Sequence, residues 1–177
     1  MTIRGAPAIG VAGAFGMALA AREKKPTSKS ELLKVLKEAK LYLDGARPTA
    51  VNLMWATERM VNFAESINVE SDFEQILVDE ANKIADEDVE INKKMAKNGA
   101  ALVPNNANVI HHCNTGALAT VDVGTALGVI YGILSDFRKK LICRVRDARK
   151  GNPRVGGRDK TSLARRSLDS MGIAPSR

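Results

Sequence analysis

The sequence has few aromatic residues, few cysteines and no long hydrophobic run. Aromatic residues make up 4% of its 177 residues, and its two cysteines are Cys113 and Cys143. Two cysteines in a chain of this length do not build a disulfide framework, so a reducing, cytoplasmic setting is expected. The longest apolar stretches, residues 6–21 and 124–134, are too short or too rich in Gly and Ala to span a membrane. No basic segment precedes the first of them, which argues against a signal peptide.

Charge is distributed unevenly along the chain. The net charge is +7, but residues 138–177 hold 13 Lys and Arg against 3 Asp and Glu, whereas the first 137 residues hold 14 against 17. A basic tail can bind nucleic acid. This tail has no aromatic residue to stack on bases and no recognisable nucleic-acid motif, so nucleic acid is not the expected partner.

Hydrophobic periodicity predicts four helices in residues 1–103. The first is small and apolar throughout, which predicts a helix packed closely on all sides. The second opens with a capping-box pattern, Ser28 with Glu31. Trp55, in the third, is expected to lie in the core. The expected ranges or start points, in order, are residues 7–23, 28–45, 48 onward and 71–98.

The following residues predict a different kind of structure. Strands are expected at Asn108–Cys113 and Leu141–Val145, with a small-residue loop and a helix over residues 124–137 between them. Strand, loop, helix and strand form a βαβ unit, which begins a parallel sheet. The predicted fold class is therefore α/β. A helical N-terminal domain, residues 1–103, precedes the first βαβ unit of an incomplete Rossmann-like parallel-sheet domain, residues 104–145.

Cys113 falls at the carboxyl end of the first predicted strand, where open α/β sheets bind their ligands. The next residues, Asn114-Thr115-Gly116, can offer backbone N–H groups to a phosphate. A thiol in this position can be activated as a base or nucleophile. The alternative is a buried structural cysteine at a tight turn. His111 and His112 point to opposite faces of the strand, so no metal site is predicted.

Two arginines precede predicted helix starts, Arg4 in Arg4-Gly5-Ala6-Pro7 and Arg47 in Arg47-Pro48-Thr49. Arginine binds phosphate in a forked geometry, and helix N-termini add unpaired N–H donors. Together the two arginines could bind one phosphorylated substrate. The alternative for each is a surface arginine near a helix start.

Three longer motifs contain these residues. They are Arg4-Gly5-Ala6-Pro7-Ala8-Ile9-Gly10, Ala46-Arg47-Pro48-Thr49-Ala50-Val51-Asn52-Leu53 and His112-Cys113-Asn114-Thr115-Gly116-Ala117-Leu118-Ala119-Thr120. Together with residues 124–130, they closely resemble the methylthioribose-1-phosphate isomerase family. That family belongs to a superfamily with the regulatory subunits of eukaryotic initiation factor 2B and with ribose-1,5-bisphosphate isomerase. The resemblance covers residues 1–135.

The resemblance implies a helical N-terminal domain, a Rossmann-like C-terminal domain and a homodimer. It implies an enzyme of methionine salvage that converts 5-methylthioribose 1-phosphate, an aldose derivative, to 5-methylthioribulose 1-phosphate without a cofactor. By the same resemblance, Arg4, Gly5, Ala6 and Arg47 bind the substrate, and Cys113 is the catalytic cysteine.

Parts of the family pattern have no counterpart in this sequence. They are the family's first segment, its Gln-Gly-Ala motif, its catalytic Asp and an Asn-Lys pair. The chain is therefore expected to be incomplete at both ends and to lack isomerase activity by itself. A non-catalytic, sugar-phosphate-sensing module of the initiation factor 2B type is the alternative function, and the presence of Cys113 favours the enzyme.

The basic tail is expected to have a separate origin. Read one base later, codons permitted for residues 145–149 encode Cys-Glu-Thr-Arg, which is similar to a segment that the family has at this place. Residues 146–177 also lack a periodic hydrophobic pattern. We therefore expect residues 146–177 to come from a shifted reading frame and to be poorly ordered.

Overall fold

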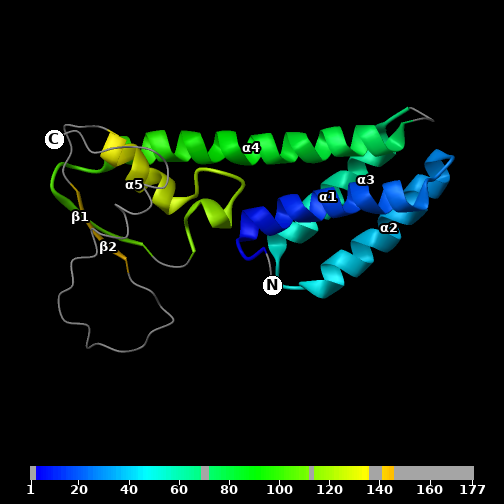
Figure 1. Cartoon of the computed structure of the whole chain (residues 1–177), viewed down its shortest axis with the longest axis horizontal. Coiled ribbons are helices and arrows are strands. Elements are labelled where there is room, and N and C mark those ends of the chain that lie inside the picture. Colours follow the sequence, from blue (N-terminus) through cyan, green and yellow to red (C-terminus); the bar gives the residue numbers. More distant parts are fainter. Residues whose placement is uncertain (1–2, 69–71, 112–113, 136–140, 146–177) are drawn as a thin grey trace.

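The computed structural model describes residues 3–68, 72–111, 114–135 and 141–145 of the chain. Four helices make up what we call the helical body: α1 (Ala6–Lys24), α2 (Lys29–Ala46), α3 (Val51–Ser66) and α4 (Phe73–Leu102). α4 has 30 residues and runs along most of the molecule, with the other three helices gathered beside one half of it (Figure 1). The four helices predicted for this part of the sequence are therefore present.

The small residues of α1 let its neighbours come close to its backbone. A Cβ added at Gly13 would lie only 2.3 Å from a methyl group of Leu53, so α3 packs directly on the α1 backbone. The prediction that α1 is packed on all sides is wrong at one face. Phe15 and Leu19 of α1 are 38% and 50% exposed.

The hydrophobic core of the helical body draws on all four helices. Burial of one apolar stripe per helix accounts for the 3.6-residue periodicity of α2, α3 and α4. The buried members of this core are Ala14, Met17, Ala18, Ala21, Leu32, Leu36, Ala56, Met60, Val61, Ala64, Phe73, Leu77, Ala81 and Ile84.

The start of α2 has the capping box that the sequence predicts. The Ser28 hydroxyl accepts a hydrogen bond from the Glu31 N–H (3.3 Å), and the Glu31 carboxylate accepts one from the Thr27 N–H (2.8 Å). The hydrogen bonds from Thr27 hold the pKa of Glu31 below its ordinary value. α4 begins without such a cap, because its N-cap residue Asp72 has a left-handed backbone (φ 57°) and its side chain accepts no capping bond.

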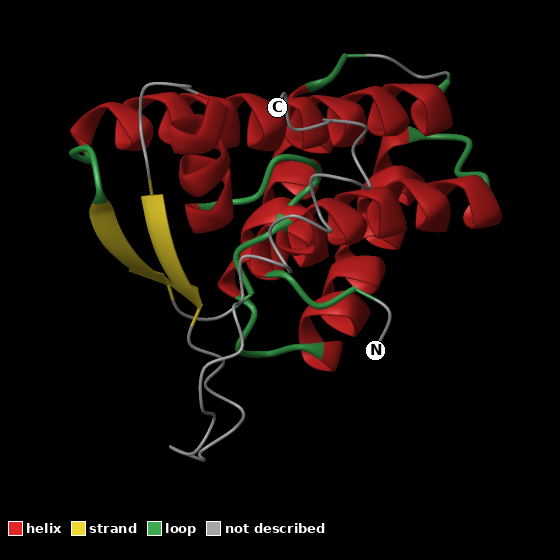
Figure 2. Cartoon of the chain, turned by 60° about the vertical axis from the view of Figure 1, so that its left-hand side comes forward, coloured by secondary structure: helices red, strands yellow, loops and turns green. Residues whose placement is uncertain are grey.

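The remaining elements form what we call the sheet end: β1 (Ala107–His111), the 3-10 turn η1 (Ala117–Ala119), α5 (Ala126–Ser135) and β2 (Leu141–Val145). The two strands pair in parallel, with Ala107 opposite Leu141, which confirms the predicted parallel pairing (Figure 2). α5 packs on α4 at a glycine, since a Cβ added at Gly132 would lie 3.0 Å from the Ala96 carbonyl oxygen.

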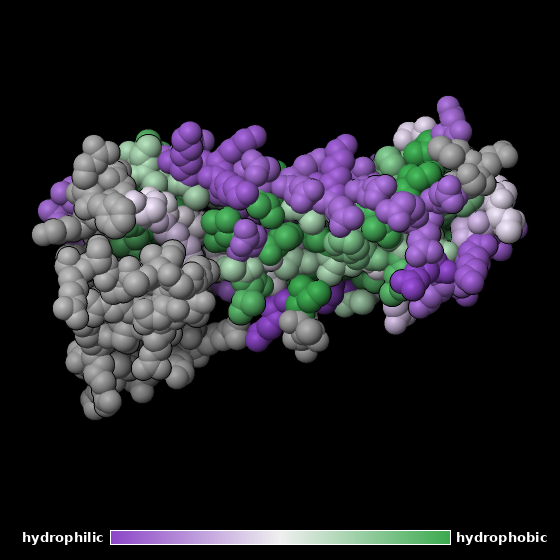
Figure 3. Space-filling view, turned by 45° about the horizontal axis from the view of Figure 1, so that its top comes forward, coloured by the Kyte–Doolittle hydropathy of each residue, from purple (hydrophilic) through white to green (hydrophobic). Residues whose placement is uncertain are grey.

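The surface combines a long polar face with hydrophobic areas beside it (Figure 3). Trp55 is 52% exposed, so its predicted place in the core is wrong. Within the described ranges, no helix is long and apolar enough to cross a membrane. The large hydrophobic side chains that are more than half exposed are Leu41, Tyr42, Val51, Trp55, Ile91, Leu102, Ile110 and Leu118.

Candidate functional site

The three sequence motifs meet around the start of α1. Gly5, the N-cap residue of α1, is buried against η1, and a Cβ added to it would lie 2.1 Å from both Cα and O of Ala119. One helical turn further along α1, a Cβ added at Gly10 would lie 2.8 Å from the Asn52 carbonyl oxygen, at the start of α3. The first motif therefore touches the second and the third through backbone contacts that only glycine allows.

The loop of residues 114–125, which we call the η1 loop, is closed by its own hydrogen bonds. The Thr115 carbonyl oxygen accepts the N–H groups of Thr125 (2.9 Å) and Leu127 (3.3 Å), and the Thr120 hydroxyl accepts the Gly124 N–H (3.0 Å). Gly124 has a left-handed backbone (φ 84°), which favours glycine at this place. These bonds make the small-residue motif a compact loop at the start of α5.

His111 connects β1 to this loop. Its Nδ1 is 3.1 Å from the Thr115 hydroxyl oxygen, which is hydrogen-bonding distance. Its Nε2 is buried and has no hydrogen-bond partner. Among the described residues, no group of three or more His, Cys, Asp and Glu side chains is arranged to hold a metal ion.

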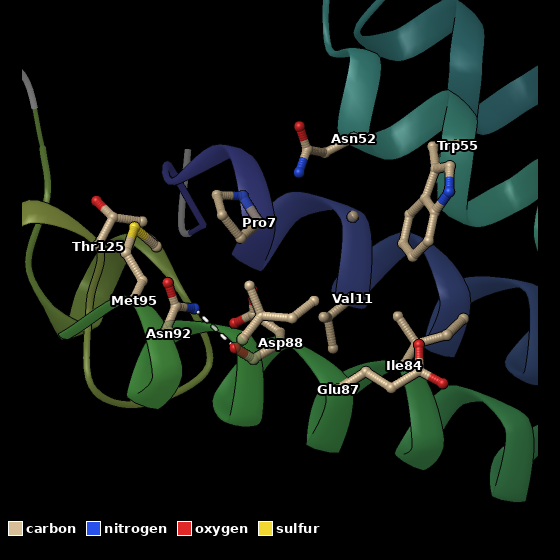
Figure 4. A pocket seen from close by; sticks show the side chains of 12 residues that line it. Pro7, Val11, Asn52, Trp55, Ile84, Glu87, Asp88, Asn92, Met95 and Thr125 are labelled. Carbon is tan, nitrogen blue, oxygen red and sulfur yellow. Dashed lines mark hydrogen bonds between the residues drawn. The ribbon is translucent and has the colours of Figure 1, made fainter. Parts of the chain in front are cut away.

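A pocket with a volume of about 350 Å³ opens beside the start of α1. Figure 4 shows its side chains, which come from α1, α3, α4 and the residue before α5. All three motifs or their immediate continuations contribute to it, through Pro7 and Gly10, Asn52, and Thr125. Its full lining is Pro7, Gly10, Val11, Asn52, Trp55, Ile84, Glu87, Asp88, Ile91, Asn92, Met95 and Thr125.

An ion-pair network borders the pocket. Arg59 of α3 donates to Glu80 (2.8 Å from Nε) and to Glu87 (3.0 Å from Nη2) of α4, and its guanidinium lies 5.6 Å from the centre of the Trp55 ring. The hydrogen bond to Arg59 lowers the pKa of Glu87, and the bonds to Glu87 and Glu80 raise the pKa of Arg59. Glu80 is only 7% exposed, and a buried carboxylate is costly unless a cation is paired with it. Arg59 is that cation.

Sequence reasoning missed this network, although part of the signal was present. Trp55 and Arg59 are four residues apart on α3, and Glu80 and Glu87 are seven apart on α4, so each pair shares a helix face. Nothing in the sequence states that these two faces oppose each other, because that depends on how α3 and α4 pack.

The predicted substrate-binding residues lie in different environments. Arg4 and Ala6 are exposed on either side of the buried Gly5. Arg47 is half-buried and ends α2, where its N–H donates to the Asp44 carbonyl oxygen (3.2 Å). The expected start of the third helix at Pro48 is wrong. Residues 48–49 form a turn and α3 begins at Val51, because proline suits a turn as well as a first helical position.

Neither helix start near these arginines is capped by a side chain. Neither Gly5, before α1, nor Ala50, before α3, supplies a side-chain cap, and neither first turn holds an acidic residue. Unpaired N–H groups at a helix start favour phosphate and other anions. The catalytic candidate Cys113 and its neighbour His112 lie outside the described residues, as does the tail of residues 146–177.

Most of the chain matches a known protein family. Residues 2–165 match the Initiation factor 2 subunit family. The chain belongs to this family. The match includes the whole helical body, the sheet end and the first twenty residues of the tail.

Members named methylthioribose-1-phosphate isomerase are similar in sequence. The chain is 55% identical over 131 residues to methylthioribose-1-phosphate isomerase 2 of Pseudothermotoga lettingae, covering 73% of this chain and 37% of the relative. It is 50% identical over 131 residues to the enzyme of that name from a Synechococcus species, covering 73% of this chain and 38% of the relative. The chain thus spans less than two fifths of the length of these curated relatives.

Two solved structures resemble the whole arrangement. The translation initiation factor eIF-2B subunit delta from A. fulgidus is 41% identical, with a TM-score of 0.70 over 97% of this chain and 48% of that one. The 5-methylthioribose 1-phosphate isomerase from Pyrococcus horikoshii is 32% identical, with a TM-score of 0.65 over 98% of this chain and 52% of that one. Both the enzyme and the initiation factor therefore share the fold of this chain.

Proposed function

We propose that this chain forms part of a methylthioribose-1-phosphate isomerase and contributes the site for the sugar phosphate. The reaction converts the aldose derivative 5-methylthioribose 1-phosphate to the ketose 5-methylthioribulose 1-phosphate. The observation that carries the proposal is the meeting of the three motifs at the start of α1, through Gly5 on Ala119 and Gly10 on Asn52. The names of the similar relatives supply the substrate.

The phosphate group of the substrate is proposed to bind to Arg4 and Arg47 beside the open start of α1. The guanidinium groups provide forked donors, and the Ala6 and Ala8 N–H groups of the first helical turn, on either side of Pro7, add to them. No acidic residue in the first turn of α1 or α3 opposes the charge of the phosphate. The small, exposed Ala6 lets the phosphate approach the backbone, and Gly5 brings the η1 loop to the same place.

Cys113 is proposed as the catalytic cysteine, on the strength of the family motif alone. The reaction opens a sugar ring and moves hydrogen between C2 and C1, which requires groups that donate and accept protons. A thiol that follows β1 by two residues in the sequence, directly before the η1 loop, has the chemistry for such a role.

The pocket beside α1 suits the apolar end of this substrate. Val11, Ile84, Ile91 and Met95 provide apolar walls, and the Trp55 ring provides an aromatic surface. Thioether sulfur makes favourable contacts with aromatic rings. The methylthio group of the substrate is proposed to occupy this pocket.

A non-catalytic sensor of sugar phosphates is the second candidate function. The similarity to the eIF-2B delta subunit from A. fulgidus favours it, since that structure has a higher identity and TM-score than the isomerase structure. The two candidates differ in the need for a reactive thiol. An isomerase needs Cys113 to react, whereas a sensor needs only the binding residues.

Several wider features belong to the same proposal. We expect residues 104–145 to form the start of a Rossmann-like domain, because their two strands pair in parallel around a crossover helix. The protein is expected to be a cytoplasmic homodimer, by resemblance to the family. Its expected partner is a small phosphorylated sugar, and neither a membrane nor nucleic acid is an expected partner.

Substitution of the arginines tests the binding site. Arg4→Ala and Arg47→Ala should each weaken binding of 5-methylthioribose 1-phosphate by about 1.5–3 kcal/mol, the range for hydrogen bonds to charged groups. Arg→Lys should restore only part of the affinity, because the fork is lost. Calorimetry measures this, with Arg22→Ala as the control, since Arg22 is exposed and pairs only loosely with Glu74 (3.5 Å). Unchanged affinity in both variants would contradict the proposal.

Thiol labelling separates the enzyme from the sensor. For an isomerase, iodoacetamide should modify Cys113 well before Cys143, and 5-methylthioribose 1-phosphate should protect Cys113. Mass spectrometry of the labelled peptides measures both rates. Equal labelling of the two thiols without protection would favour the sensor.

A further inference from the structure

Asp88 of α4 holds the η1 loop from outside. Its Oδ2 accepts a hydrogen bond from the Val121 N–H at 3.0 Å, across 33 residues of sequence. Val121 directly follows Thr120, whose hydroxyl closes the loop by accepting the Gly124 N–H. A bond from a carboxylate to a backbone N–H is charge-assisted and therefore among the stronger hydrogen bonds.

The position of Asp88 on α4 is itself well fixed. Asn92, one turn further along and 2% exposed, donates its side-chain Nδ2 to the Asp88 carbonyl oxygen (2.9 Å). Further along, α4 packs closely on α5. A Cβ added at Gly99 of α4 would lie 2.8 Å from the Val129 side chain of α5. Asp88 is thus carried by a helix that packs closely on α5 on its C-terminal side.

The other side of the η1 loop contacts the proposed phosphate site. Gly5 packs on Ala119, two residues before Val121, with no room for a side chain between them. The loop therefore lies between the start of α1 and Asp88. If the bond from Asp88 is lost, the loop keeps its internal closure but loses this hydrogen bond to α4.

We propose that Asp88 is a positioning residue that sets the distance between the η1 loop and the Arg4-Gly5-Ala6 segment. It acts on the phosphate site through the Val121 N–H, from a position in the wall of the pocket that we propose for the methylthio group. This role rests on the proposed function, because the property it controls is the affinity of the site for a phosphorylated sugar. Asp88 lies outside all three sequence motifs.

Two variants of Asp88 separate positioning from direct contact. Asp88→Ala removes the acceptor, whereas Asp88→Asn keeps an oxygen that can accept the Val121 N–H but removes the charge. Asp88→Ala should bind 5-methylthioribose 1-phosphate about tenfold more weakly by calorimetry, the effect of losing one such hydrogen bond. Asp88→Asn should bind within about threefold of the wild type. The matched control is Asp86→Ala, an exposed carboxylate on the same helix.

Amide hydrogen exchange of the 177-residue chain gives a readout that needs no substrate. Exchange at Val121 should become at least about tenfold faster in Asp88→Ala, and stay close to wild type in Asp88→Asn and Asp86→Ala. Unchanged exchange at Val121 would show that the bond does not hold the loop and would overturn the proposal.

The binding data test whether the Asp88 bond affects the affinity for the sugar phosphate. Faster exchange with unchanged affinity in Asp88→Ala would overturn the positioning role while leaving the proposed function intact. Equal loss of affinity in Asp88→Asn and Asp88→Ala would also overturn it, because the charge rather than the bond would then matter. If the wild type binds no sugar phosphate, the proposed function fails and the positioning role fails with it, while Val121 exchange still reports on the bond itself.

Discussion

The helical body and the sheet end bury their hydrophobic residues to very different degrees. The core cluster lies entirely between Ala14 and Ile84 of the helical body. In the sheet end, Ile130 and Ile133 of α5 are buried, whereas Ile110 of β1 and Leu118 of η1 are 71% and 87% exposed. A pair of strands is marginally stable by itself, so the sheet end depends on its packing against α4. The helical body therefore supplies most of the stability, and the sheet end supplies the η1 loop.

Two different junctions connect the parts: α5 packs on α4 through buried apolar side chains, whereas the η1 loop meets the helical body through backbone contacts. Gly5 lies against Ala119, and Asp88 bonds the Val121 N–H. Such a junction sets the position of a loop accurately while adding little hydrophobic stabilisation. Stability and the candidate site can therefore be changed separately in this molecule.

The largest expected effect is in the core of the helical body. Leu36→Ala should lower the free energy of unfolding by about 2–5 kcal/mol, because Leu36 is fully buried and its removal leaves a cavity. Ile110→Ala, in the sheet end, should change it by no more than about 0.5 kcal/mol. Urea denaturation measures both. A loss at Ile110 as large as that at Leu36 would remove the contrast between the two parts.

The next largest effect is at the junction. Gly5→Ala should cost about 1–3 kcal/mol, because its Cβ would overlap the Ala119 backbone and force the η1 loop away from α1. The control is Gly45→Ala, where an added Cβ meets nothing within 4 Å and helix propensity predicts a gain of about 0.5–1 kcal/mol. Thermal unfolding of both variants checks the pair. Equal effects would mean that the close approach of Gly5 is unimportant.

A smaller effect is expected at the cap of α2, far from the sheet end. Ser28→Ala should lower stability by about 1 kcal/mol, since the Ser28 hydroxyl caps the Glu31 N–H. Binding of the sugar phosphate should be unaffected, because the cap does not touch the junction. Parallel denaturation and calorimetry test this separation, and a loss of affinity would show that the two parts are not independent.

The smallest effect depends on pH. Because Arg59 lowers the pKa of Glu87, the pair stabilises the fold above the unfolded-state pKa of Glu, about 4.3, and that stabilisation is lost as the pH falls through the folded-state pKa. Glu87 is 41% exposed, so solvent screening keeps the effect below about 1 kcal/mol. Between about pH 5 and pH 3, the wild type should lose slightly more stability than Glu87→Gln.

Denaturation at several pH values measures this difference. Glu90→Gln serves as the control, because Glu90 is exposed on the same helix and makes a surface pair with Lys93. A wild type and Glu87→Gln with identical acid profiles would show that the pair with Arg59 carries no net stabilisation.

The sequence predicted the local elements well and their packing less well. Periodicity and the Ser28 capping box located the helices because these signals are local in the chain. The parallel pairing of the strands followed from their crossover helix. The helix start predicted at Pro48 was wrong, because a proline fits both a turn and a helix start. The core position predicted for Trp55 was wrong, because its exposure depends on how closely α3 packs on α4.

The candidate site divides in the same way. The three motifs could be found from the sequence, but their meeting at Gly5 and Gly10 is a property of packing. Asp88 and the Arg59 network lie outside all three motifs, and only the folded arrangement brings them to the pocket. The role of Cys113 and the shifted reading frame of residues 146–177 stay predictions, since both lie outside the described residues.

The tight contacts at Gly5 and Gly10 also affect how sequences of this kind can diverge. A mutation that adds a methyl group at either position collides with a neighbouring backbone, so selection for folding alone would retain both glycines. Their persistence in a lineage that had lost all enzymatic activity would therefore be unsurprising. The neighbouring Arg4 is exposed and not fixed by such a collision. Its retention or loss is the better record of whether a lineage still binds phosphate.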